Sequence, residues 1–326
     1  MSFRSIVIRS FCHSLCNLGE TDMNIKGSFV ALITPFTEAG AIDFLSLRKL
    51  VQKHMQEGTN GLVCLGSTGE KSTLSQEEQK KIVEIVLEES QGRLPVIVGT
   101  GTNNTAESID FTRVVKSMGA AAALVIVPYY NRPTEEGCFY HFQEIAQIGL
   151  PIIAYHHPGR TGLFISCTGW KKIASIPQII AIKESSRKIS FMQELFSEIS
   201  KPIICGDDDL LLSSFEMGAV GSISVIANLL PRKWSEVIHL LLQRENLAAK
   251  DRFLSLLSLL EAIFLESNPI GVKWAMHLLG LCEPFLRLPL TIASEEARQK
   301  ISQAVCMIQN TILQERLDKK IMPMMN

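Results

Sequence analysis

The sequence predicts a (β/α)8 barrel, or TIM barrel, with an additional helical region at its C-terminal end. From residue 29 onward, eight short runs rich in Val, Ile and Leu recur, each followed by a Gly or Asn turn and then by apolar residues at helical spacing. Near-continuous apolar strands that alternate with helices are typical of a parallel sheet covered on both faces. Eight is the strand number of this barrel. The alternative is an open doubly wound sheet, but the chain lacks its Gly-x-Gly-x-x-Gly fingerprint.

The expected strands follow one another at a spacing that leaves room for one helix between each pair. They are Phe29–Thr34, Leu62–Leu65, Val96–Gly99, Leu124–Val127, Ile152–Tyr155, Ile179–Ile182, Ile203–Cys205 and Gly221–Val225. Between the first two, Leu47, Leu50 and Val51 form the apolar face of an amphipathic helix. Further on, Ser75 and Glu78 have the spacing of a capping box at a helix start.

After the eighth run the pattern changes to helices only. The expected helices are Trp234–Leu242, Leu254–Phe264, Val272–Leu279 and Glu295–Leu313. The second of these is apolar on more than one face, so we expect it to be buried on two sides. The chain therefore divides into an N-terminal segment (1–22), a barrel (23–232) and C-terminal helices that complete and cap it (233–326).

The N-terminal segment contains Arg4 and Arg9, several serines and no acidic residue before Glu20. It does not fit a secretory signal, because Arg9 interrupts the apolar run and no Ala-x-Ala-like site follows. An organelle transit peptide is one interpretation. A disordered tail, or a start codon assigned too early with Met23 ahead of the first strand, is the interpretation that we favour.

Composition excludes several classes of function. The chain has 326 residues, with 32 Lys and Arg against 33 Asp and Glu, for a net charge of −1. This balance gives no general attraction to nucleic acid or anionic membranes. No apolar run is long enough to span a bilayer. The eight cysteines are scattered without a Cys-x-x-Cys pair, which indicates free thiols, a reducing compartment and a cytoplasmic protein without a zinc site.

In a parallel barrel the functional residues lie at the carboxyl ends of the strands. Lys183 ends the sixth apolar run, and an amine in an apolar surrounding is partly neutral, which makes it a nucleophile for a carbonyl group. The alternative interpretations are a pair with Glu184 or a solvated charge at the strand end. Tyr155 ends the adjacent run and can relay protons to a Schiff base if it is hydrogen-bonded to Ser67 or Thr68.

The turn that contains Ser67 and Thr68 is flanked by Gly66 and Gly69, which allow backbone amides to approach a small carboxylate. Arg160, close to Pro158 and flanked by glycines, is a candidate clamp for a substrate carboxylate.

Other constellations do not predict a site. His156 and His157 are adjacent, so their side chains diverge in an extended strand. Asp207, Asp208 and Asp209 have the residue type for Mg²⁺, but acids at a helix start also complement its dipole. We therefore expect no metal. The chain has neither a Walker A loop nor a Gly-x-Ser-x-Gly elbow.

Together these motifs resemble a known family. The matching segments are Gly66-Ser67-Thr68-Gly69-Glu70, Pro128-Tyr129-Tyr130-Asn131-Arg132-Pro133, Tyr155-x-x-Pro158-x-Arg160-Thr161-Gly162, Ile182-Lys183-Glu184, Gly206-Asp207-Asp208 and Asn268-Pro269-Ile270-x-Val272-Lys273. In this order, over residues 23–313, they are similar to the dihydrodipicolinate synthase and N-acetylneuraminate lyase family. The resemblance implies a (β/α)8 barrel that binds pyruvate as a Schiff base on Lys183 and needs no cofactor. The resulting enamine attacks an aldehyde, which in the synthase branch is aspartate semialdehyde, on the route to diaminopimelate and lysine.

The resemblance also implies roles for individual residues. Ser67, Tyr155 and Tyr130 would form the proton relay, with Tyr130 reaching into the site of a neighbouring subunit. Thr68 would hold the pyruvate carboxylate and Arg160 the carboxylate of the aldehyde. The implied substrate-binding residues also include Gly206 and Ile223. The family relationship further implies a homotetramer built as a dimer of dimers.

Two departures from the synthase pattern are visible. Ser67 stands where the synthases usually have Thr, although the hydroxyl remains. His156 replaces the usual Asn after the strand-five tyrosine, and an imidazole there would alter the polarity of the site.

The main alternative function is a pyruvate-dependent aldolase that acts on a sugar acid or hydroxy-keto acid. A non-catalytic binder of small ligands is the other alternative.

The sequence also predicts weak or absent inhibition by lysine. Some members of the synthase branch bind lysine at a subunit interface, and Asn103, Glu107 and Tyr129 match that site. Its other positions differ, since they hold Lys71, Gln76 and Gln79, and Lys71 adds a charge that repels a lysine ligand. We expect the rate of pyruvate consumption to stay unchanged when millimolar lysine is added, and strong inhibition would contradict this prediction.

Overall fold

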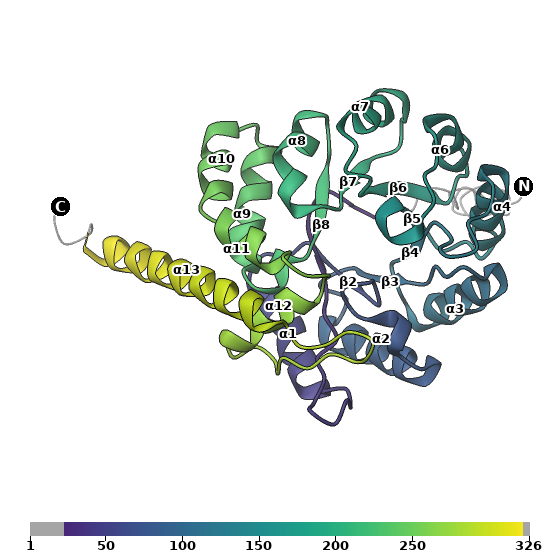
Figure 1. Ribbon diagram of the computed structural model, residues 1–326. Helices are drawn as coiled ribbons and strands as arrows, with labels where there is room; N and C mark the ends of the chain where they lie inside the picture. Colours follow the sequence, from purple (N-terminus) through teal and green to yellow (C-terminus); the bar gives the residue numbers. More distant parts are fainter. Residues whose placement is uncertain (1–22, 322–326) are drawn as a thin grey trace, which may run out of the picture.

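The computed structural model describes residues 23–321, with side chains described to residue 310. Eight parallel strands close into a barrel in which each strand pairs with the next and β8 returns to β1 (Figure 1). The strands are β1 (Gly27–Ala31), β2 (Gly61–Cys64), β3 (Val96–Gly99), β4 (Ala122–Ile126), β5 (Ile152–His156), β6 (Ile179–Glu184), β7 (Ile203–Cys205) and β8 (Gly221–Ser224). The expected barrel is confirmed, and the open sheet is excluded. The expected N-terminal segment, 1–22, lies outside the described residues.

The eight expected strands all appear, with shifted ends. β1 ends at Ala31, three residues earlier than expected, although the amide of Leu32 still donates to Val63 O. β6 continues through Lys183 and Glu184, because Tyr155 and His156 of β5 pair with them in register. Lys183 is therefore held inside a paired strand and not on a loop after it.

Helices surround the barrel and connect its strands (Figure 1). They are α1 (Phe44–Gln56), α2 (Gln76–Ser90), α3 (Thr105–Met118), α4 (Glu135–Ala146), α5 (Pro158–Thr161), α6 (Cys167–Ala174), α7 (Ile189–Glu198) and α8 (Leu211–Glu216). The expected capping box at the start of α2 is confirmed: Ser75 Oγ accepts from the Glu78 amide, and the Glu78 carboxylate accepts from the Ser75 amide. Within residues 23–321, none of the helices combines the length and the apolarity needed to cross a membrane.

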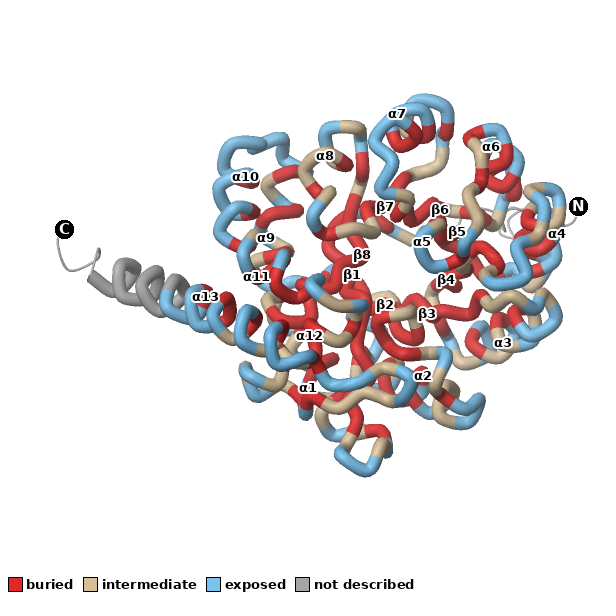
Figure 2. Tube along the Cα trace, viewed as in Figure 1, coloured by how far each residue is buried: buried red, intermediate tan, exposed pale blue. Residues whose placement is uncertain are grey.

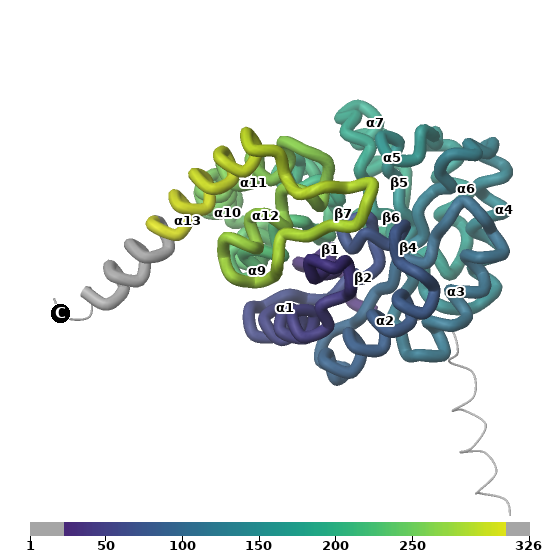
Figure 3. The backbone as a smooth tube through the Cα atoms, turned by 60° about the horizontal axis from the view of Figure 1, so that its bottom comes forward, coloured from purple at the N-terminus to yellow at the C-terminus, as the bar shows by residue number. Residues whose placement is uncertain are grey.

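The C-terminal region consists of α9 (Pro231–Leu242), α10 (Asn246–Leu254), α11 (Leu257–Ile263), α12 (Ile270–Leu278) and α13 (Glu295–Ile321). α9 contacts β1 and fills the last position around the barrel, whereas α11, α12 and α13 pack together beside it (Figure 3). The helix expected over 254–264 is confirmed as α11 with a later start, because the chain turns at Ser255 and Leu256, and α10 before this turn was not expected. This turn buries Leu256 and Phe253 and leaves Leu254 half-exposed.

The strands of the barrel are buried, whereas the surrounding helices expose part of their surface (Figure 2). The pleat of the strands divides the buried core into two layers. Alternate side chains fill the barrel interior, and the others pack between the barrel and its helices. On β6, Ala181 belongs to the interior layer and Ile182 to the outer layer. On β5, Tyr155 belongs to the interior layer and Ala154 to the outer one. This alternation decides which of the chemically interesting side chains can reach the mouth of the barrel.

Candidate active site

A cavity of about 520 Å³ opens at the carboxyl ends of the strands. It is lined by side chains or backbone from the ends of β2, β5, β6 and β7 and from the C-terminal helices. The lining includes six of the predicted site residues, namely Ser67, Thr68, Tyr155, Arg160, Lys183 and Gly206. Six residues from distant parts of the sequence therefore meet at one site.

Lys183 is the amine of this cavity. Its side chain lies in the interior layer, 6% exposed, with Nζ 4.2 Å from the centroid of the Tyr155 ring. Glu184 points to the opposite face of β6 and bonds to His156, so the alternative interpretations of a Lys183–Glu184 pair or a solvated lysine are wrong. A Cβ atom at Gly206 would lie 2.8 Å from Lys183 Cε. The absence of a side chain at Gly206 therefore leaves room for the lysine.

The loop after β2 is fixed by hydrogen bonds from distant segments. The Asn268 amide donates to Thr68 Oγ1 at 2.8 Å, and the Thr34 hydroxyl donates to the backbone oxygen of Gly69 at 2.7 Å. Ser67 faces both the main cavity and an adjoining one. Among the described residues, no hydrogen bond joins the hydroxyl groups of Ser67 and Tyr155.

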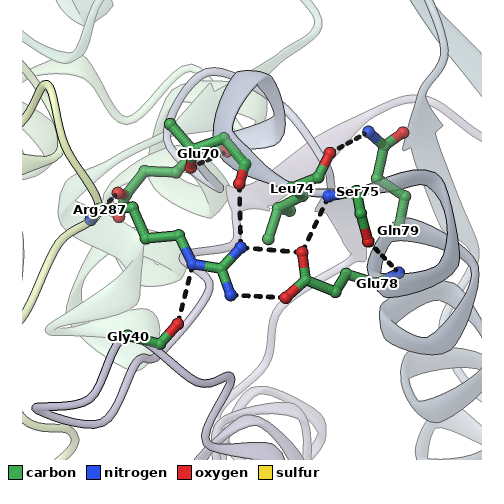
Figure 4. A network of polar contacts seen from close by, with 8 residues as sticks. Gly40, Glu70, Leu74, Ser75, Glu78, Gln79 and Arg287 are labelled. Atoms are coloured by element: carbon green, nitrogen blue, oxygen red, sulfur yellow. Dashed lines mark hydrogen bonds and ion pairs between the residues drawn. The ribbon is translucent and has the colours of Figure 1, made fainter.

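Glu70 anchors the end of this loop to the C-terminal region. It is 3% exposed, has a left-handed backbone with φ of 53°, and forms an ion pair with the fully buried Lys273 at 2.5 Å. Burial lowers the pKa of Lys273, and the neighbouring Glu70 carboxylate opposes this shift. The Arg287 amide donates to Glu70, and the Arg287 guanidinium forms two hydrogen bonds with Glu78 (Figure 4). Through these bonds the pKa of Glu78 falls to about 2.

His156 does not face the cavity. Its ring is fully buried among Phe164, Trp170 and Phe191, with Nδ1 2.8 Å from Glu184 Oε2. The expectation that it alters the polarity of the site is therefore wrong, because the pleat turns it toward the helices. His157 lines the cavity instead, and burial lowers its pKa to about 3, so this imidazole is neutral near pH 7.

The three aspartates after β7 have different surroundings. Asp208 is buried and accepts the backbone amides of Val225 and Ile226, so it fastens the end of β8. Asp207 lines the cavity, and burial raises its pKa to about 6. Asp209 pairs with Arg187. Across the described part of the chain, no group of three His, Cys, Asp or Glu side chains is arranged to hold a metal ion.

Three predicted residues occupy distinct places. Arg160, on α5, donates to the backbone oxygen of Asn268 at 3.2 Å and faces both cavities. Tyr130 is 86% exposed and lines neither cavity within this chain. Ile223 is buried in the barrel interior, and Val225, two residues later, lines the cavity.

The adjoining cavity, about 450 Å³, contains four of the six residues considered for lysine binding, without Asn103 and Gln76. Glu107, Tyr129, Lys71 and Gln79 line it. Lys71 Nζ donates to the backbone oxygen of Gly101 at 3.3 Å, and burial lowers the pKa of Lys71 to about 8. The lysine of the chain itself thus occupies part of this space.

Sequence reasoning missed the residues that support the site. The sequence shows Asn268 and Lys273 only as parts of a motif, because their partners, Thr68 and Glu70, are about 200 positions away along the chain. One signal was available: a lysine within the apolar helical stretch 270–279 requires a buried partner.

The fold and the cavity define a (β/α)8-barrel protein with a buried lysine at the end of β6. The dihydrodipicolinate synthetase family matches residues 24–308. The 4-hydroxy-tetrahydrodipicolinate synthase of Pseudomonas aeruginosa is 41% identical over 284 residues, which cover 86% of this chain and 97% of that protein. The chain belongs to the dihydrodipicolinate synthetase family.

Solved structures agree with this assignment. Dihydrodipicolinate synthase from Aquifex aeolicus is 40% identical, with a TM-score of 0.84 over 86% of this chain and 97% of that one. The chloride-inhibited enzyme from Acinetobacter baumannii, solved with pyruvate, is 39% identical, with a TM-score of 0.86 over 88% and 99% of the two chains. These names favour the synthase branch over the sugar-acid aldolase and the non-catalytic binder.

The buried pair of Glu70 and Lys273 is expected to contribute strongly to stability. Lys273→Met keeps the length of the side chain but leaves the Glu70 carboxylate buried without its partner, which costs about 3–5 kcal/mol. Urea unfolding should show this loss. The matched change Lys300→Met, at the exposed pair with Glu296, should leave the unfolding midpoint unchanged. Equal midpoints for both variants would contradict the prediction.

Proposed function

We propose that the protein condenses pyruvate with L-aspartate 4-semialdehyde to give 4-hydroxy-tetrahydrodipicolinate, in the biosynthesis of diaminopimelate and lysine. The observation that carries this proposal is the buried amine of Lys183 beside Tyr155, in a cavity that also contains Arg160. Synthase relatives about 40% identical to this chain support the choice of reaction.

The reaction starts with attack of the Lys183 amine on the keto carbon of pyruvate. Loss of water gives an imine, and removal of a proton from the methyl carbon gives an enamine. The enamine carbon attacks the aldehyde carbon, which forms the new C–C bond. When the proton leaves the methyl carbon, the protonated imine accepts the electron pair of the broken C–H bond. This chemistry therefore requires no further cofactor. The amino group of the aldehyde substrate then attacks the imine carbon, which closes the six-membered ring of the product and breaks the C–N bond to Lys183, so the lysine amine is released.

Proton transfer in these steps is assigned to Ser67, Tyr155 and Tyr130. Ser67 and Tyr155 line the same cavity as the amine, which supports their part in the relay. Tyr130 is exposed, with a left-handed backbone at φ of 72°. A relay that includes it is completed by a second copy of the chain. The proposal therefore includes a dimer at least, and by family resemblance a dimer of dimers.

Carboxylate binding is assigned to two sides of the cavity. Thr68 holds the carboxylate of pyruvate, and Arg160 holds that of the aldehyde. Gly206 provides space beside the lysine, and Ile223 supports the floor of the site from the barrel interior.

The buried thiols of Cys64, Cys138 and Cys205 suit a reducing compartment, and we place the reaction in the cytoplasm.

The assignment of the nucleophile can be tested by trapping. Borohydride reduces an imine to a stable amine, so the wild-type protein incubated with pyruvate should gain the mass of one reduced adduct on Lys183. Lys183→Ala should gain none and should show no pyruvate consumption. Lys188→Ala, which removes a nearby lysine outside the cavity, serves as the control and should behave as wild type. An adduct retained in Lys183→Ala would refute the assignment.

The choice of aldehyde tests the function. We expect pyruvate consumption with aspartate semialdehyde and none with N-acetylmannosamine or glyceraldehyde. Arg160→Ala should raise KM for aspartate semialdehyde about 10- to 100-fold, because a charge-assisted hydrogen bond to its carboxylate is lost. KM for pyruvate should stay unchanged. Arg113→Ala, on the exposed face of α3, is the control. A preference for a sugar aldehyde would move the protein to the aldolase branch.

A further inference from the structure

Asn268 connects the two sides of the cavity at which carboxylate binding is proposed. It precedes α12 and lines the cavity. Its side-chain amide donates to Thr68 Oγ1 at 2.8 Å, and its backbone oxygen accepts from Arg160 Nη2 at 3.2 Å. One residue of the C-terminal region therefore contacts both Thr68 and Arg160.

In the hydrogen bond between Asn268 and Thr68, the Asn268 amide is the donor and the Thr68 hydroxyl oxygen is the acceptor. A hydroxyl group has one proton to donate and two lone pairs. Because the Asn268 amide donates to the Thr68 oxygen, one lone pair is occupied and the hydroxyl proton remains available to another acceptor. A carboxylate is acceptor only, so this arrangement makes Thr68 a donor toward an anion. The amide also polarises the O–H bond, which strengthens the hydrogen bond that it donates.

The surroundings hold Asn268 in place. The Ile270 amide donates to the backbone oxygen of Ser267, and the Lys273 amide donates to that of Pro269. Lys273 in turn forms the buried ion pair with Glu70. The start of α12 thus holds the loop after β2 at two points, Thr68 and Glu70.

We infer that Asn268 is a positioning residue, which orients the Thr68 hydroxyl as a donor toward the carboxylate of the first substrate. The side chain of Asn268 acts on the pyruvate side only. Arg160 is held by the backbone oxygen of Asn268, which any residue at this position retains. The inference rests on the proposed function. It also predicts that changes of this side chain affect one substrate and not the other.

Two variants of Asn268 test whether its side chain orients the Thr68 hydroxyl. In Asn268→Ala, Thr68 is no longer oriented, and we expect KM for pyruvate to rise about ten-fold, the loss of roughly one hydrogen bond. In Asn268→Asp, the carboxylate accepts the Thr68 proton and withdraws it from the substrate, so KM for pyruvate should rise about 100-fold. KM for aspartate semialdehyde should stay within about two-fold of wild type in both variants, because the backbone contact to Arg160 persists. A merely structural role would instead make the nearly isosteric Asp the milder change.

The experiment also includes a double-mutant cycle with Thr68→Val. The exposed variant Asn246→Ala serves as the control. In the Thr68→Val background, Asn268→Ala should add no further rise in KM for pyruvate, since the shared partner is gone. Borohydride trapping at increasing pyruvate gives the same comparison without the aldehyde. An unchanged KM for pyruvate in both Asn268 variants, equal rises for both substrates, or additive effects in the cycle would overturn the inference. No adduct and no turnover in wild type would instead refute the proposed function.

Discussion

The register between β5 and β6 is the constraint on which the site depends. It pairs Tyr155 with Lys183 and His156 with Glu184. Because side chains alternate along paired strands, the first pair faces the barrel interior and the second faces the helices. A shift of β6 by one residue would turn the Glu184 carboxylate into the cavity and bury Lys183 behind it. The closed sheet, with each strand held on two sides, prevents that shift.

The C-terminal helices also belong to the site, although most of the functional side chains come from the barrel. Asn268 contacts Thr68, and Lys273 contacts Glu70, so the loop after β2 takes its shape from residues far along the chain. Arg287 and Glu78 extend the same network to α2. The buried members of this network, Glu70 and Lys273, are paired with each other, and a buried polar pair favours one arrangement of the loop. This explains how a flexible turn of small residues can hold hydroxyl groups in fixed places.

Much of the site was accessible from the sequence, because apolar runs identify strands and the barrel places their carboxyl ends at one mouth. That reasoning brought Lys183, Tyr155, Ser67 and Arg160 together correctly. It failed where a side chain could lie on either face of a strand. His156 was expected to influence the cavity and faces the helices. The helix α10 was not expected, because it buries only Ala249 and Phe253 and its apolar residues do not form a clear stripe.

The sequence by itself determined the barrel, the order of its strands and the residues at their ends, because hydrophobic periodicity and turn residues act locally along the chain. The tertiary structure decided which polar groups are partners. Glu70 and Lys273, or Thr68 and Asn268, meet only once the barrel has closed and the C-terminal helices have packed beside it. Burial then requires each charge or amide to find a partner, and no local pattern in the sequence states which one it is.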